Sequence, residues 1–85
     1  MEKLKERVIG RIDELREQIV AIGQKIHAKP ELGFEEVFAC ELLSSAIGDF
    51  GFSVEQGVGG LETAFVATHE AACDGPTVAL LAEYD

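Results

Sequence analysis

The sequence has no tryptophan, one tyrosine, two prolines and two cysteines in 85 residues, and it is short of basic side chains. Two cysteines are too few for the disulfide framework of a small secreted domain. Seven Lys and Arg against sixteen Asp and Glu leave a net charge of −9. This balance argues against nucleic acid or an anionic membrane surface as a partner, because phosphate binding requires an excess of cations.

Long apolar runs are also missing, since no stretch approaches the roughly 20 residues that span a bilayer. The start of the chain lacks the apolar core of a signal peptide, so a cytoplasmic protein is expected. The length allows at most one small domain, and residues 1–85 show no linker or internal repeat. We therefore treat 1–85 as part of a single domain.

Two helices are predicted first. Apolar residues from Leu4 to Ile26 recur at spacings of four and three, which predicts a helix over residues 2–28. The same spacing would suit a short coiled coil, but a single helix laid across a sheet is favoured because β-type segments follow. Pro30 should end this helix. A second helix is expected over 34–50, with Gly33 as N-cap and Glu36 three residues into a capping box. Gly51 suits the left-handed position after its end.

Three strands should follow, at Ser53–Gln56, Ala64–His69 and Thr77–Tyr84. The third is almost entirely apolar, which is typical of a strand buried on both faces, and it should run antiparallel to its predecessor. The predicted fold is therefore α/β: two N-terminal helices followed by three strands of a mixed sheet.

Glu83 and Asp85 close the third predicted strand. In open α/β sheets, ligands bind beyond the carboxyl ends of the strands. A carboxylate buried there is costly to desolvate unless another group pairs with it. A metal ion or a metal-bound histidine could be that partner. A simple exposed strand end is the alternative. We expect the chain to be the first part of a larger catalytic domain and to be inactive alone.

Other patterns indicate structure more than chemistry. Residues 57–62 (G-V-G-G-L-E) lack the final small residue and the following helix of a dinucleotide loop, so a flexible strand connection is favoured. A zinc site from His27, Cys40, His69 and Cys73 is disfavoured because only His69 and Cys73 have a plausible ligand spacing. The acidic cluster at Glu31, Glu35 and Glu36 is better explained by the positive end of the second helix than by acid–base catalysis.

Two separated segments resemble one protein family. Residues 26–36 read I-H-A-K-P-E-L-G-F-E-E and are similar to the L-H-x-x-P-E-L-S-F-E-E segment of the aminoacylase and amidohydrolase metallopeptidases (metallopeptidase family twenty). Residues 75–85 read G-P-T-V-A-L-L-A-E-Y-D and resemble the family's G-P-T-V-A-L-R-A-D-M-D strand. Residues 59–65 lie where the family has its G-G-T-G-V-x-A strand entry. The A-E-Y-D ending resembles the branch of p-aminobenzoyl-glutamate hydrolases and dipeptidases cleaving basic-residue dipeptides.

The resemblance implies a hydrolase that cleaves the amide bond of N-acyl amino acids or dipeptide-like small molecules with two divalent metal ions, zinc or manganese. It further implies that these helices and strands are the start of an α/β sandwich catalytic domain, and that the full-length protein is a homo-oligomer. By the motif, Asp85 would orient a metal-ligating histidine. Glu83 occupies the position of a metal-binding His in distant relatives and is only a neighbour of the site. No metal ligand or bound metal is expected within this chain, and His27 is carried over as a structural residue.

A non-catalytic alternative remains open beside the enzyme. The spacing of the first helix and the apolar strand at the end of the chain would also suit a small module that pairs through a helix or an open sheet edge.

Overall fold

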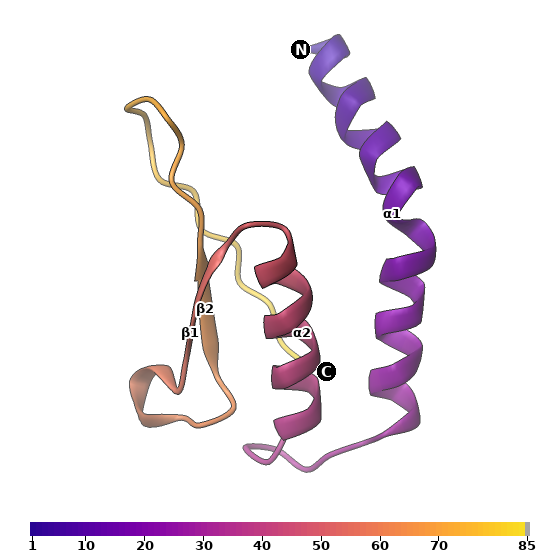
Figure 1. Ribbon diagram of the computed structural model, residues 1–85, viewed down its shortest axis with the longest axis vertical. Coiled ribbons are helices and arrows are strands. Elements are labelled where there is room, and N and C mark those ends of the chain that lie inside the picture. The colour runs from indigo at the N-terminus through magenta and orange to yellow at the C-terminus, as the bar shows by residue number, and fades with distance from the viewer. Residues whose placement is uncertain (85) are drawn as a thin grey trace. The chain divides into compact units, whose positions relative to one another are not determined.

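The computed structural model describes residues 1–84. The described residues form helix α1 (Glu2–Ala28), helix α2 (Val37–Asp49), strand β1 (Ser53–Gln56), a 3-10 turn η1 (Val58–Gly60) and strand β2 (Phe65–Thr68), in that order (Figure 1). They divide into two compact units, Met1–Pro30 and the segment from Glu31 onward.

Helix α1 occupies the range that its apolar spacing predicts. Lys25 and His27 lie in its last turn, where cationic side chains suit the negative end of the helix dipole. Lys29 has left the helical region, at φ −129° and ψ 73°, because a residue before proline is disfavoured there. None of the residues of α1 is buried in the described part of the chain.

Helix α2 ends at Asp49, one residue before the predicted end, and its start differs more. Gly51 follows it with φ +92°, the left-handed conformation that glycine adopts at low cost. The predicted start at residue 34 and the N-cap at Gly33 are wrong: the helix begins at Val37, and Glu36 is its N-cap without a side-chain cap bond. The physical reason is Phe34, whose φ of +67° interrupts the helical path just before α2.

The described sheet has two antiparallel strands, with Ser53 opposite Thr68 and Gln56 opposite Phe65. The bounds of β1 are those predicted, and β2 is one residue shorter at each end. One face of this hairpin contacts α2. The small core consists of four side chains that are less than 9% exposed: Ala39, Cys40, Ser44 and Thr63.

The third predicted strand is absent from the described residues. Residues 77–84 have no regular secondary structure, so the sheet is antiparallel and two-stranded, not mixed and three-stranded. Val78, Leu80 and Leu81 are 80%, 93% and 99% exposed. An apolar strand requires a hydrogen-bonding neighbour and cover on both faces, and the described residues give this segment neither. It instead runs back toward α2 (Figure 1).

Candidate functional site

The best-defined polar arrangement lies at the start of α2. Both carboxylate oxygens of Glu31 accept hydrogen bonds from the first turn of the helix: Oε2 from the Phe38 amide at 2.9 Å and Oε1 from the Ala39 amide at 3.1 Å. These amides have no partner inside the helix. A carboxylate here also faces the positive end of the helix dipole. Glu31 therefore caps α2 from seven and eight residues upstream.

A tight loop brings Glu31 back to the helix. The amide of Glu35 donates to the carbonyl of Leu32 at 2.9 Å. Phe34 adopts its left-handed conformation within this turn. The attribution of the acidic cluster to the helix start is thus correct for Glu31, whose carboxylate has a structural role.

Tyr84 connects the end of the described chain to the same region. Its hydroxyl donates to the carbonyl oxygen of Thr63, 21 residues earlier in the sequence. Thr63 is 7% exposed. The pKa of Tyr84 is raised well above its ordinary value, first by burial, then by a hydrogen bond and charge from Cys40 and by the nearby carboxylates of Glu36 and Glu31. The neutral phenol is therefore the stable form in this position.

Cys40 is a buried thiol in the core and is 3% exposed. Its Sγ lies 3.9 Å from the hydroxyl oxygen of Ser44, one turn further along α2. Both Cys40 and Cys73 are free, and Cys73 is exposed. Cys40 thus occupies the position of a small core residue, as its helical pattern predicts.

Of the two carboxylates predicted to mark the site, the structure describes Glu83. Glu83 is exposed. Asp85 lies outside the described residues. Its predicted role beside a metal-ligating histidine therefore stays a prediction. The side chain of Tyr84, which lies between them in the sequence, makes a long-range contact.

The weaker sequence patterns have structural explanations. Residues 57–62 form the connection between β1 and β2 through η1, with the Gly57 amide donating to the Ala64 carbonyl at 2.8 Å. His69 packs its ring against Phe52, with centroids 5.4 Å apart and planes tilted by 51°. Among residues 1–84, no three His, Cys, Asp or Glu side chains come together in a way that could hold a metal ion.

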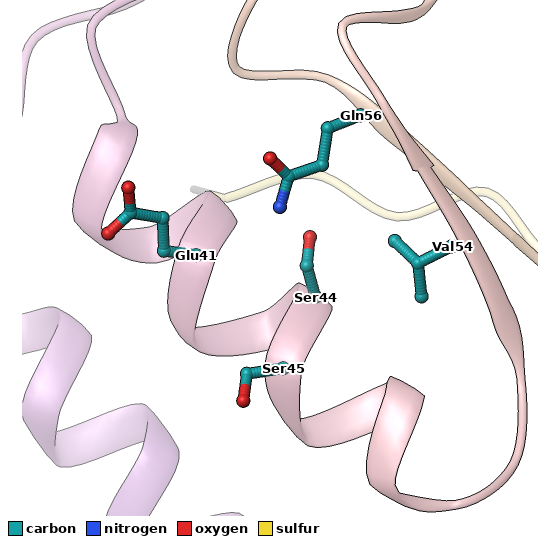
Figure 2. Close-up of a pocket in the computed structure, with 5 residues that line it drawn as sticks. All are labelled: Glu41, Ser44, Ser45, Val54 and Gln56. Atoms are coloured by element: carbon teal, nitrogen blue, oxygen red, sulfur yellow. The ribbon is translucent and has the colours of Figure 1, made fainter.

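A hollow of about 330 Å³ lies between α2 and β1 (Figure 2). Its walls are formed by Glu41, Ser44, Ser45, Val54 and Gln56. The lining contains one carboxylate, two hydroxyls and an amide but no histidine, lysine or cysteine. The lining therefore lacks the histidine or lysine that commonly activates a serine nucleophile. The hollow does not involve Glu83 or Tyr84.

Within the described residues, then, the chain supplies a scaffold. Glu31 fixes the start of α2, and Tyr84 holds the terminal segment to Thr63 beside it. Sequence reasoning missed both contacts. The Glu31 carboxylate just before a helix was a usable signal for a cap, whereas no local pattern links residue 84 to residue 63.

Neither α1 nor α2, the two α-helices of residues 1–84, combines the length and the apolar character that crossing a membrane requires.

Comparison with known proteins identifies relatives along most of the chain. No protein-family model matches it. Thermostable carboxypeptidases 2 and 1 of Saccharolobus solfataricus are each 37% identical over 82 residues, which are 96% of this chain and 21% of the carboxypeptidase. A p-aminobenzoyl-glutamate hydrolase subunit of Escherichia coli is 38% identical over 74 residues, which are 87% of this chain and 15% of the relative.

The chain thus spans about a fifth or less of the length of these relatives. The match to the carboxypeptidases covers 82 of the 85 residues, so both motif segments fall within it in whole or in large part. One relative comes from the very branch that the A-E-Y-D ending indicates. This chain belongs to the aminoacylase and amidohydrolase family predicted from its motifs.

Proposed function

We propose that this chain forms part of a hydrolase that cleaves the amide bond of N-acyl amino acids or dipeptide-like small molecules. The observation that carries the proposal is the identity of 37–38% to carboxypeptidases and to a p-aminobenzoyl-glutamate hydrolase subunit. Both kinds of enzyme are named for the cleavage of an amide bond at an amino acid. Because the chain spans about a fifth or less of their length, other segments of the complete polypeptide would supply most of the active site.

The proposed hydrolase uses two divalent metal ions, zinc or manganese, held by residues outside this chain. The described residues contain no group of three potential ligands, so no catalytic step is assigned to them. Bound metal would supply Lewis-acid polarisation of the amide carbonyl and a hydroxide nucleophile. In this proposal Asp85 orients a metal-ligating histidine, a role in which a carboxylate fixes the ring and raises its basicity.

The described contacts support a positioning role for the terminal segment. The Tyr84 hydroxyl holds the backbone next to Asp85 at the carbonyl of Thr63, and Glu31 anchors the adjacent start of α2. We propose that residues 77–84 become the third strand when the remaining sheet of an α/β sandwich covers Val78, Leu80 and Leu81. Burial of these three exposed side chains would favour that change by several kcal/mol, at roughly 1.5–3 kcal/mol for each.

The test uses the complete polypeptide that contains this chain. Release of free amino acid is measured from an N-acetyl amino acid, p-aminobenzoyl-glutamate and a basic dipeptide, after chelation and after addition of zinc or manganese. We expect metal-dependent cleavage of at least one substrate, and none by residues 1–85 alone. Failure to cleave any of them with either metal would overturn the proposed activity.

The Asp85→Asn variant tests the assigned role. Loss of a carboxylate beside a ligating histidine should lower metal affinity or activity by about 10–100-fold. Asp74→Asn is the matched control, because Asp74 is an exposed carboxylate in the loop before the terminal segment. Equal activity of the two variants would show that Asp85 has no role in the active site, without contradicting the amidohydrolase activity itself.

We further propose that the complete protein is a cytoplasmic homo-oligomer. Sedimentation of the complete protein would check its oligomeric state, and cell fractionation would check its location.

A further inference from the structure

The Tyr84 hydroxyl is bound to an acceptor that is itself held in place. It donates to the carbonyl oxygen of Thr63, a residue that is 7% exposed and lies in the connection between η1 and β2. Backbone hydrogen bonds close this connection on either side of Thr63. The Leu61 amide donates to the Val58 carbonyl at 3.1 Å, and the Ala64 amide donates to the Leu61 carbonyl at 3.0 Å. The acceptor of the Tyr84 bond therefore has a defined position.

The contact fixes the end of a segment whose middle is exposed. Leu80 and Leu81 are 93% and 99% exposed, and Glu83 is exposed as well. The Tyr84 hydroxyl, in contrast, also interacts with the thiol of Cys40, which is 3% exposed in the core. The side chain of Tyr84 thus joins the end of the described chain both to the hairpin connection and to α2.

A fixed Tyr84 limits where the next residue can lie. Tyr84 is bonded directly to Asp85, and consecutive Cα atoms across a trans peptide are about 3.8 Å apart. A carboxylate that orients a metal-ligating histidine must be held to within roughly 0.5 Å of its working position. We propose that Tyr84 is a positioning residue of the hydrolase: its hydrogen bond to Thr63 holds the backbone from which Asp85 orients the histidine. This inference rests on the proposed function.

A purely stabilising hydroxyl and a positioning hydroxyl predict different results. If the Tyr84 hydroxyl only stabilises the fold, its removal should have the same effect whatever residue stands at position 85. If it acts through Asp85, its removal should matter only while the Asp85 carboxylate is present. A double-mutant cycle separates the two cases, because residues that act through one another give non-additive effects.

The experiment uses the complete polypeptide and the variants Tyr84→Phe, Asp85→Asn and the double variant. Isothermal titration calorimetry measures the Kd of zinc and of manganese on the metal-free proteins, and kcat and KM are measured for the substrate that wild type cleaves. Val54→Ala is the control for lost packing, because Val54 is a half-buried residue of β1 that faces α2 near Gly48. Circular dichroism verifies that each variant is folded.

We expect Tyr84→Phe to weaken metal binding about fivefold, as the loss of one hydrogen bond implies. The kcat should fall by a similar factor while KM changes by less than about twofold, because the change affects the metal site rather than substrate binding. In the Asp85→Asn background the same replacement should change metal affinity by less than about twofold. Val54→Ala should leave metal affinity within about twofold of wild type.

A second variant approaches the contact from its acceptor. Thr63→Gly retains the carbonyl but loosens the backbone that holds it, so it should weaken metal binding in the same Asp85-dependent way, and it replaces Tyr84→Phe should that variant fail to fold. Equal metal affinity of wild type and Tyr84→Phe, or an equal loss with and without the Asp85 carboxylate, would overturn the positioning role. A complete protein that shows the coupling in metal binding but cleaves no substrate would contradict the proposed activity and still support the positioning role.

Discussion

The cap formed by Glu31 gives the sharpest test of the described structure. Replacement of Glu31 by Ala removes the acceptor of two amide hydrogen bonds in the first turn of α2. Loss of a helix cap costs about 1 kcal/mol, and loss of the charge at the positive helix end adds roughly 0.3–1 kcal/mol. We therefore expect the start of α2 to be destabilised by about 1.5 kcal/mol, and Glu31→Gln, which retains one acceptor oxygen, by about half of that.

Amide hydrogen exchange followed by NMR measures this effect where it should occur. A loss of about 1.4 kcal/mol corresponds to a tenfold change in an equilibrium constant, so exchange at Phe38 and Ala39 should accelerate about tenfold in Glu31→Ala. Glu35→Gln is the control, because Glu35 is an exposed carboxylate in the same loop. Its replacement should change exchange at these amides by less than about twofold. Unchanged protection of Phe38 and Ala39 in Glu31→Ala would refute the capping role.

Three further outcomes are expected. Tyr84 is the single tyrosine, and its pKa is raised in the fold above the unfolded value of about 10, so its contribution to stability is fully present below pH 10 and is lost as pH rises toward the folded pKa. Tyrosinate absorbance should therefore appear at higher pH in the native chain than in urea. A midpoint at the unfolded value would contradict the buried contact. Phe34→Asn should stabilise the chain by about 0.5–1 kcal/mol in urea unfolding. The reason is that asparagine tolerates the φ of +67° better than phenylalanine, and that Phe34 is 77% exposed and so has little packing to lose. A clear loss of stability would show that the ring contributes packing. A thiol reagent should modify Cys73 at least about tenfold faster than Cys40, since Cys40 is buried and Cys73 is exposed. Equal rates would show that the core around Cys40 opens readily.

Two kinds of residue contribute to the proposed active site in different ways. Tyr84 and Glu31 hold backbone segments in place through hydrogen bonds that no metal is needed to form. In the proposed enzyme the catalytic groups themselves would come from the remainder of the polypeptide, and Asp85 would orient a histidine among them. A Tyr84→Phe replacement should therefore weaken the terminal segment in the isolated chain by about 1 kcal/mol, whether or not the complete protein is a hydrolase.

Local sequence patterns were sufficient wherever a few contiguous residues carry the information. The four-and-three spacing and Pro30 predict α1 from Glu2 to Ala28, and the short run Ser53–Gln56 is β1. Gly51 takes the left-handed conformation expected after a helix. The family likewise follows from two contiguous motifs, and relatives at 37–38% identity confirm it. These features arise from the dihedral preferences, side-chain periodicity and order of residues within a short stretch of chain. They can therefore be recognised without knowing which distant segments come into contact in the folded protein.

Other features depend on segments that are distant in sequence. The start of α2 is set by a carboxylate seven and eight residues upstream together with the left-handed Phe34, and the sequence pattern alone favoured a start three residues too early. The contact between Tyr84 and Thr63 spans 21 residues. The apolar pattern of residues 77–84 predicts a buried strand, yet Leu80 and Leu81 are almost fully exposed. A strand's hydrogen bonds and the cover of its faces come from other segments, so apolar sequence supplies the tendency and only a neighbouring surface can complete it.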